Sequence, residues 1–144
     1  MNDERTSQTS TEIHRDQHSQ QPSDDSIVIH CDGAGSRPDG KGSGFAWIQP
    51  HTGEKHVDHV DGLTNNQAEY RALISALNSV ADGSVARVFT DSQVMCSQVV
   101  GDYKVRNAEL AELLSQVRDV IKRKQLSVGI HWIPRQKNLA GKLL

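Results

Sequence analysis

The chain has 144 residues, of which 35% are hydrophobic, and this length and composition suit one folded domain with a substantial core. No stretch approaches the roughly 18 apolar residues that a membrane-spanning helix requires, and the first residues lack the layout of a secretory signal. The two cysteines, Cys31 and Cys96, are too few for a disulfide framework. We therefore expect a cytoplasmic, monomeric protein that has neither a membrane attachment nor a disulfide partner.

Charge is unevenly distributed along the chain, although the formal net charge is only −2. Residues 1–26 hold six acidic and two basic residues, whereas residues 27–144 hold 12 acidic and 14 basic ones. The larger part of the chain is therefore mildly basic. Such a charge permits a phosphate-contacting surface but does not by itself indicate one.

The first 25 residues are almost wholly Ser, Thr, Gln, Asp, Glu, His and Asn, and Ile13 is the only sizeable apolar residue after Met1. A segment of this kind cannot bury enough apolar surface to offset the entropy lost on ordering. We therefore predict a disordered polar tail over residues 1–25 and a folded domain over residues 26–144.

Three strands are predicted at the start of this domain. Apolar and polar residues alternate over 27–32, which indicates a strand that ends at Asp32. A glycine-rich turn follows, and residues 43–49 and 54–60 then form two antiparallel strands around a turn that contains Pro50 and Gly53.

Helices and parallel strands are predicted to follow. Thr64 and Gln67 have the spacing of a capping box and open a helix that ends near residues 82–83. Residues 85–90 form a strand that ends at Asp91, and Ser92 caps a short helix that stops at Gly101. Asn107 opens an amphipathic helix, and residues 128–133 form the fifth strand. The order predicts an α/β fold with a five-stranded mixed sheet, three antiparallel strands followed by parallel ones, and flanking helices.

Two acids stand where predicted strands end. Asp32 follows the first strand and Asp91 follows the fourth. Active sites of open α/β sheets gather outside the carboxyl ends of strands, so both are candidate site residues. Aspartate is also a common turn former, and each residue has that simpler interpretation as well.

A third acid, Glu69, falls on the apolar face of its helix, in line with Leu73, Ala76 and Val80. A carboxylate there is costly unless it is paired or bound to a metal ion. A buried ion pair with an arginine is the simpler interpretation, but no arginine shares that face. Together with the two aspartates, Glu69 could form a carboxylate cluster that binds Mg²⁺ or Mn²⁺ through oxygen.

Several short segments resemble the ribonuclease H signature in order and spacing. They are residues 32–35 (Asp-Gly-Ala-Gly), 64–70 (Thr-Asn-Asn-Gln-Ala-Glu-Tyr) and 90–92 (Thr-Asp-Ser). Residues 101–107 and 132–138 are similar to the form found in many bacterial and archaeal members. The resemblance extends over residues 26–144 and implies the ribonuclease H-like fold.

The resemblance also implies a function, the metal-dependent endonucleolytic hydrolysis of the RNA strand of an RNA–DNA hybrid. Two Mg²⁺ or Mn²⁺ ions, about 4 Å apart, would act on the scissile phosphate once substrate is bound. Asp32 would bridge both ions, and Glu69 and Asp91 would complete the first site. Contacts to the 2′-hydroxyl would identify the RNA strand. The implied substrate-binding residues are Gly33, Asn65, Asn66, Ser92, Tyr103, Lys104, Arg106 and Arg135.

The chain departs from the family pattern near its end. Gly141 follows Ala140 where the family has a fourth metal-binding aspartate. Arg135 occupies the loop in which many members carry a histidine, and it could bind phosphate but cannot shuttle protons at neutral pH. The last helix is expected to have at most about six residues, too few to be stable without docking. The basic extra helix of some bacterial members is absent, which predicts a low affinity for hybrid.

Three hypotheses follow for the function. The first is an active hybrid-specific endonuclease, which the three acids and the Thr-Asn-Asn string support. The second is a catalytically impaired nucleic-acid-binding module of the same fold, which Gly141 supports. The third is a metal nuclease of the same fold that acts on other nucleic-acid geometries.

Overall fold

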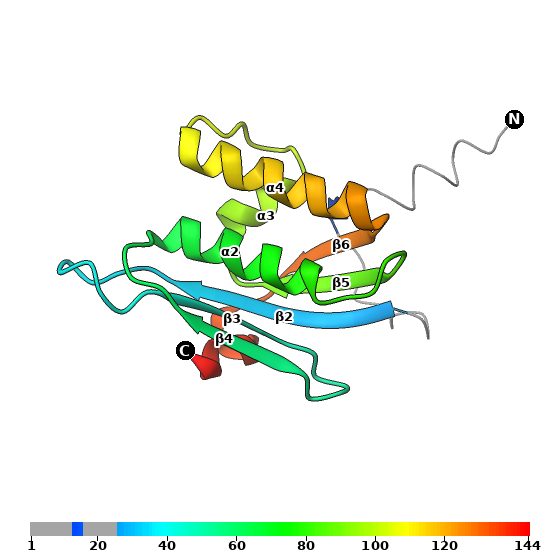
Figure 1. Cartoon of the computed structure of the whole chain (residues 1–144), viewed down its shortest axis with the longest axis horizontal. Helices are drawn as coiled ribbons and strands as arrows, with labels where there is room; N and C mark the ends of the chain where they lie inside the picture. The colour runs from blue at the N-terminus through cyan, green and yellow to red at the C-terminus, as the bar shows by residue number, and fades with distance from the viewer. Residues whose placement is uncertain (1–12, 16–25) are drawn as a thin grey trace, which may run out of the picture.

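The computed structural model describes residues 13–15 and 26–144, which form a six-stranded mixed sheet with helices packed against it (Figure 1). In chain order the strands are β1 (Ile13–Arg15), β2 (Ser26–Ala34), β3 (Gly44–Ile48), β4 (Lys55–His59), β5 (Val85–Thr90) and β6 (Ser127–Trp132). The helices are α2 (Asn65–Asn78), α3 (Gln93–Val99) and α4 (Ala108–Lys124), and two 3₁₀ turns follow, η1 (Arg135–Lys137) and η2 (Leu139–Leu143).

The sheet has the order β1-β6-β5-β2-β3-β4. β2, β3 and β4 pair antiparallel, whereas β5 pairs parallel with β2, β6 with β5, and β1 with β6. Figure 1 shows α2, α3 and α4 on one side of this sheet. The predicted mixed α/β fold is confirmed, and this arrangement leaves β2 and β5 side by side at the centre.

The core lies between the sheet and its three helices. Alternate residues of each strand point to the helical side, and the apolar stripes of α2 and α4 face them. Burial of this apolar surface is the main stabilising contribution to such a layer. Fully buried side chains include Ile29, Val88 and Ile130 from the sheet and Leu73, Leu77 and Val117 from the helices.

Side-chain caps fix where the helices begin, as the sequence predicts. The Thr64 hydroxyl accepts from the Gln67 backbone N–H, and the Gln67 side chain accepts from the Thr64 N–H, which completes the capping box. The Asn107 side chain accepts from the Leu110 N–H at the start of α4. α2 ends at Asn78, earlier than residues 82–83, because Ser79 closes it and a turn follows.

The prediction of a disordered tail is wrong for Ile13–Arg15, which form a sixth strand. β1 pairs with β6 from Ile13↔Val128 to Arg15↔Ile130, and Ile13 packs against the core. An unpaired edge strand presents free backbone N–H and C=O groups, so a three-residue segment with one large apolar side chain suffices to pair there. Residues 1–12 and 16–25, the rest of the predicted tail, lie outside the described residues.

Two predicted element ends also differ from the structure. β2 continues past Asp32 to Ala34, because Ala34 still pairs with Gly44 of β3. The expected last helix is the 3₁₀ turn η2, whose first free N–H groups are satisfied in part by the Asn138 side chain, which accepts from Ala140. Asp32 therefore lies within a paired strand, opposite Ala46 of β3.

Neither cysteine forms a disulfide, since Cys31 and Cys96 are both buried free thiols. Among the helices that the structure describes, none has the length and apolar content needed to cross a membrane.

Gly33 allows α2 to lie directly on β2. A Cβ atom at this position would be 2.3 Å from the carbonyl carbon of Ala68 and 2.5 Å from the backbone nitrogen of Glu69. Both are backbone atoms in the middle of a packed layer, so neither can move without shifting the helix. The missing side chain at Gly33 thereby sets the distance between Asp32 and Glu69.

We expect Gly33→Ala to lower the free energy of unfolding by about 2–3 kcal/mol, because it overpacks the contact between α2 and β2. Urea denaturation followed by circular dichroism measures this. Val85→Ala is the matched control, since Val85 lies on β5 with 42% of its surface exposed and its substitution should change stability by less than about 0.5 kcal/mol. Equal stability of the two variants would contradict the role given to Gly33.

Candidate metal centre

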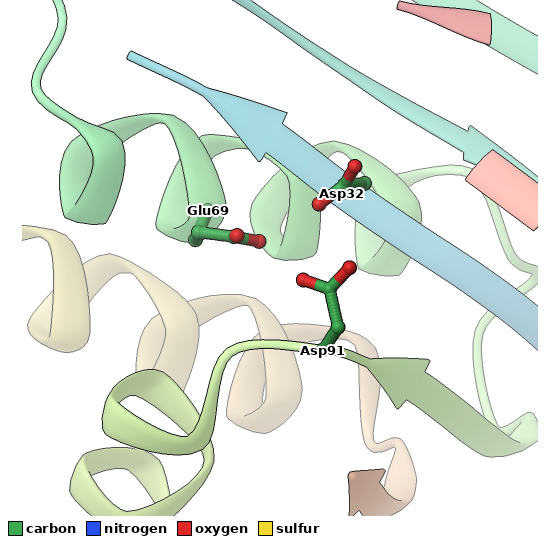
Figure 2. Close-up of side chains that lie close together, drawn as sticks. All are labelled: Asp32, Glu69 and Asp91. Atoms are coloured by element: carbon green, nitrogen blue, oxygen red, sulfur yellow. The ribbon is translucent and has the colours of Figure 1, made fainter. Parts of the chain in front are cut away.

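Three carboxylates from separate parts of the chain converge at the carboxyl end of β5 and beside β2 (Figure 2). Asp32 comes from β2, Glu69 from the first half of α2, and Asp91 from the residue after β5. One carboxylate oxygen of each residue lies within 4.8 Å of a carboxylate oxygen of both other residues. The cluster is the point at which the two central strands and α2 meet.

Two oxygens of this cluster are buried without a hydrogen-bond partner in the described part of the chain, Glu69 Oε1 and Asp91 Oδ2. Glu69 is 8% exposed, and the other two residues are half-buried. Buried polar atoms in folded proteins almost always have a partner. A bound cation would satisfy these two oxygens, which no donor of the described residues reaches.

Burial and mutual repulsion shift the pKa values of Asp32 and Glu69 upward. Desolvation, followed by the charges of Asp32 and Asp91, raises the pKa of Glu69 to about 9. Desolvation and the charge of Asp91 raise the pKa of Asp32 to about 6, whereas the positive charge of Arg135 acts to lower it. Without a cation, the cluster would retain a proton at neutral pH.

The donor set fits a hard divalent cation. All three side chains offer only oxygen, which suits Mg²⁺ and Mn²⁺, and neither histidine nor cysteine takes part in the cluster. The unpartnered oxygens of Glu69 and Asp91 provide ligand positions that no protein donor occupies. Asp32, Glu69 and Asp91 are thus the residues that would hold such an ion.

The C-terminal segment is fixed beside this cluster by Asn138, which the sequence analysis did not single out. The Asn138 side chain is 1% exposed and donates to the Cys31 carbonyl at 2.9 Å. The Leu139 N–H donates to His30 Nδ1 at 3.1 Å. These contacts bring Gly141 so close that a Cβ atom there would lie 3.0 Å from Asp32 Oδ2. The sequence signal that could have indicated this role is the polar side chain of Asn138, which follows the last strand.

The carboxylates line a cleft of about 780 Å³, termed here the acidic cleft. Trp132 stands at its rim, 40% exposed, and its indole N–H donates to the Asp91 carbonyl at 3.2 Å. Lys142, a cation that the sequence analysis missed, also lines it. Of the substrate-binding residues predicted from the sequence, the acidic cleft brings together Gly33, Asn65, Asn66, Ser92 and Arg135.

The remaining predicted substrate-binding residues lie elsewhere. Tyr103 and Lys104 line a second cleft of about 600 Å³, termed here the loop cleft, which is bounded by the loop after α3 and by α4. Arg106 is exposed and lines neither cleft. A substrate that touched both groups would therefore have to extend beyond the acidic cleft.

We expect the stability of the chelator-treated protein to fall as pH rises. The folded-state pKa exceeds the ordinary value for Asp32 (3.8 to about 6) and for Glu69 (4.5 to about 9), so the folded state binds more protons than the unfolded state across these ranges. The stability that protonated Asp32 and Glu69 contribute at low pH is therefore lost as the pH rises through about 6 and then about 9. Urea denaturation at acid, neutral and alkaline pH measures the loss.

Glu69→Gln is the control for this measurement. Burial lowers the pKa of His30, which acts in the opposite direction near its ordinary value of 6.5, and this contribution is common to both proteins. The difference between wild type and Glu69→Gln should therefore grow with pH. A difference in stability that is constant with pH would show that ionisation of Glu69 does not destabilise the folded protein.

Comparison with known proteins places the chain in a family. A family model described as reverse transcriptase-like matches residues 31–144, which include all three carboxylates. The bifunctional protein Rv2228c of Mycobacterium tuberculosis is 29% identical over 119 residues, which are 78% of this chain and 32% of that protein. The chain thus spans about a third of the length of the curated relatives that it matches.

Solved structures agree with this match. The N-terminal RNase H domain of Rv2228c is 29% identical, with a TM-score of 0.68, over 78% of this chain and 85% of that one. RNase H1 from the archaeon Halobacterium salinarum is 26% identical, with a TM-score of 0.69, over 83% and 93%. LC11-RNase H1, solved in complex with an RNA/DNA hybrid, is 29% identical, with a TM-score of 0.69, over 82% and 92%. The match to the family model and these neighbours establish that the chain belongs to the ribonuclease H family.

Proposed function

We propose that the protein is a metal-dependent endonuclease that hydrolyses the RNA strand of RNA–DNA hybrids. The observation that carries this proposal is the convergence of Asp32, Glu69 and Asp91, with two unpartnered buried oxygens, inside the acidic cleft. The solved complex of LC11-RNase H1 with a hybrid supports the choice of substrate class.

The three carboxylates would hold divalent cations, two of them when substrate is bound. Such ions supply Lewis-acid stabilisation and activation of a water molecule for attack on a phosphodiester. The fold contributes by fixing the positions of the three carboxylates. Asp32 is held by the pairing of β2 with β3, Glu69 is fixed by the contact of α2 with Gly33, and Asp91 is tethered through its backbone to Trp132.

Polar groups around the carboxylates would bind the backbone of a nucleic acid. The Asn65 side-chain carbonyl accepts from the Gly35 N–H at 2.7 Å, which leaves its NH₂ group to donate to a substrate oxygen. Asn66 lies beside it on the first turn of α2, and together they would recognise the 2′-hydroxyl that distinguishes RNA from DNA. Arg135 and Lys142 would bind phosphate oxygens on the C-terminal side of the cleft.

A second candidate function is a nucleic-acid-binding module with impaired catalysis, and Gly141 favours it. This residue lies next to Asp32, so a carboxylate side chain in its place would point at the cluster. Its absence removes a possible ligand beside Asp32. Mg²⁺ sites often rely on few protein oxygens together with waters and phosphates, so we favour a weakened enzyme over an inactive one.

We expect purified protein to cleave a labelled RNA–DNA hybrid in Mg²⁺ or in Mn²⁺. Asp91→Asn should reduce kcat/KM by more than about a hundredfold, since even indirect contacts to a metal ion contribute about 10- to 100-fold. Duplex RNA and duplex DNA of the same sequence serve as comparison substrates. Wild-type cleavage no faster than that of Asp91→Asn in both metals would refute the enzyme, and faster cleavage of either duplex would refute the hybrid specificity.

We expect Gly141→Asp to bind Mn²⁺ about tenfold more tightly than wild type, because it returns a carboxylate to the cluster. Titration calorimetry measures the affinity, and the metal concentration at half-maximal cleavage provides a second readout. Gly141→Asn, of the same size without the charge, is the control and should not improve binding. Hybrid binding without cleavage by wild type, with cleavage restored in Gly141→Asp, would establish the binding module instead.

A further inference from the structure

β1 lies on the far side of β6 from the metal centre and carries an arginine that the proposed reaction does not use. Residues that pair across a sheet point to the same side, and Arg15 pairs with Ile130, which is fully buried under the helices. The Arg15 side chain therefore extends over the helical side of the sheet. Its guanidinium donates to Asp102 Oδ2 at 2.5 Å and to Cys96 Sγ at 3.5 Å.

Asp102 belongs to the loop that carries the other predicted substrate-binding residues. It directly precedes Tyr103 and Lys104, and all three line the loop cleft. Arg118 of α4 lines the same cleft, so its charged residues are two cations and the single acid Asp102. A phosphate group that entered this cleft would be attracted by Lys104 and Arg118 and repelled by Asp102.

The ion pair with Arg15 neutralises this acid. The loop backbone does not need it, because the N–H groups of Asp102 and Tyr103 both donate to the Ser97 carbonyl at the end of α3. The pair instead fixes the carboxylate toward β1 and cancels its charge. Arg15 is 34% and Asp102 56% exposed at the side chain, so the charge would act on a nearby phosphate if Arg15 were absent.

We propose that Arg15 is a positioning residue for nucleic-acid backbone binding, since it holds and neutralises Asp102 and so makes the loop cleft attractive to phosphate. The N-terminal strand thereby completes a second contact surface for the hybrid, apart from the carboxylates. This inference rests on the proposed function, because it concerns how the same substrate is held.

The test compares hybrid affinity in single and double variants of the full chain. Binding of a short fluorescein-labelled hybrid is measured by anisotropy in EDTA, where no turnover occurs, and KM and kcat are measured with metal. Arg15→Ala and Arg15→Gln should raise Kd and KM about two- to fivefold, in line with an exposed pair, and leave kcat unchanged. The loss should shrink as salt is added.

Asp102→Asn separates neutralisation from a purely structural role. If Arg15 acts by cancelling the charge, Asp102→Asn binds hybrid as well as wild type or better, and Arg15→Ala combined with Asp102→Asn regains wild-type affinity. A pair that merely held the loop would lose affinity in all of these variants. Arg123→Ala and Asp119→Asn are the matched controls, because they break an exposed pair on α4 that does not touch the loop.

Each outcome decides between the two proposals. Unchanged affinity in both Arg15 variants, or weaker binding in Asp102→Asn, would overturn the role of Arg15 while wild-type binding still supported the proposed function. A wild-type protein that neither binds hybrid in EDTA nor cleaves it in Mg²⁺ or Mn²⁺ would overturn the proposed function, and the role of Arg15 with it. Melting temperatures of the variants verify that each remains folded.

Discussion

The cost of placing three carboxylates together is the constraint on which the rest of the structure depends. Burial and repulsion both oppose the charged forms of Asp32 and Glu69, so the three carboxylates would separate if nothing held them together. The fold holds them through contacts made by other atoms. Gly33 lets α2 approach β2 until backbone touches backbone, and Trp132 fixes the residue that follows β5. The strain of the cluster is therefore offset by the packing of the whole layer.

The hydrogen bonds of Asn138 fix the position of the C-terminal segment beside this cluster. Asn138 is buried and uses its side chain on both sides, donating to Cys31 and accepting from Ala140. A buried amide satisfied in this way fixes one arrangement of the backbone, since any other would leave polar groups unpaired. The arrangement it selects places the C-terminal turn next to Asp32, so the end of the chain becomes a wall of the acidic cleft.

Much of the fold could be predicted from local patterns, and the failures have physical reasons. The alternation in β2, the capping box at Thr64 and the apolar stripe of α4 are patterns within short segments, so the sequence alone predicts them. The position of Glu69 on an apolar face indicated its inward orientation. β1 was missed because three residues with one apolar side chain have no period, and their pairing depends on the free edge of β6. The location of Tyr103 in a cleft apart from the carboxylates could not be predicted, because it depends on how α3 and α4 pack, which no local pattern records.

The pairing of β1 with β6 has a consequence for how the molecule is made. It joins residues 13–15 to residues 128–130, which belong to the first and last of the strands that the structure describes. During synthesis the early segment leaves the ribosome long before its partner exists, and contacts so distant in sequence form late because closing a long loop costs entropy. The border of the sheet, and with it the ion pair between Arg15 and Asp102, should therefore be among the final contacts to form in the nascent protein.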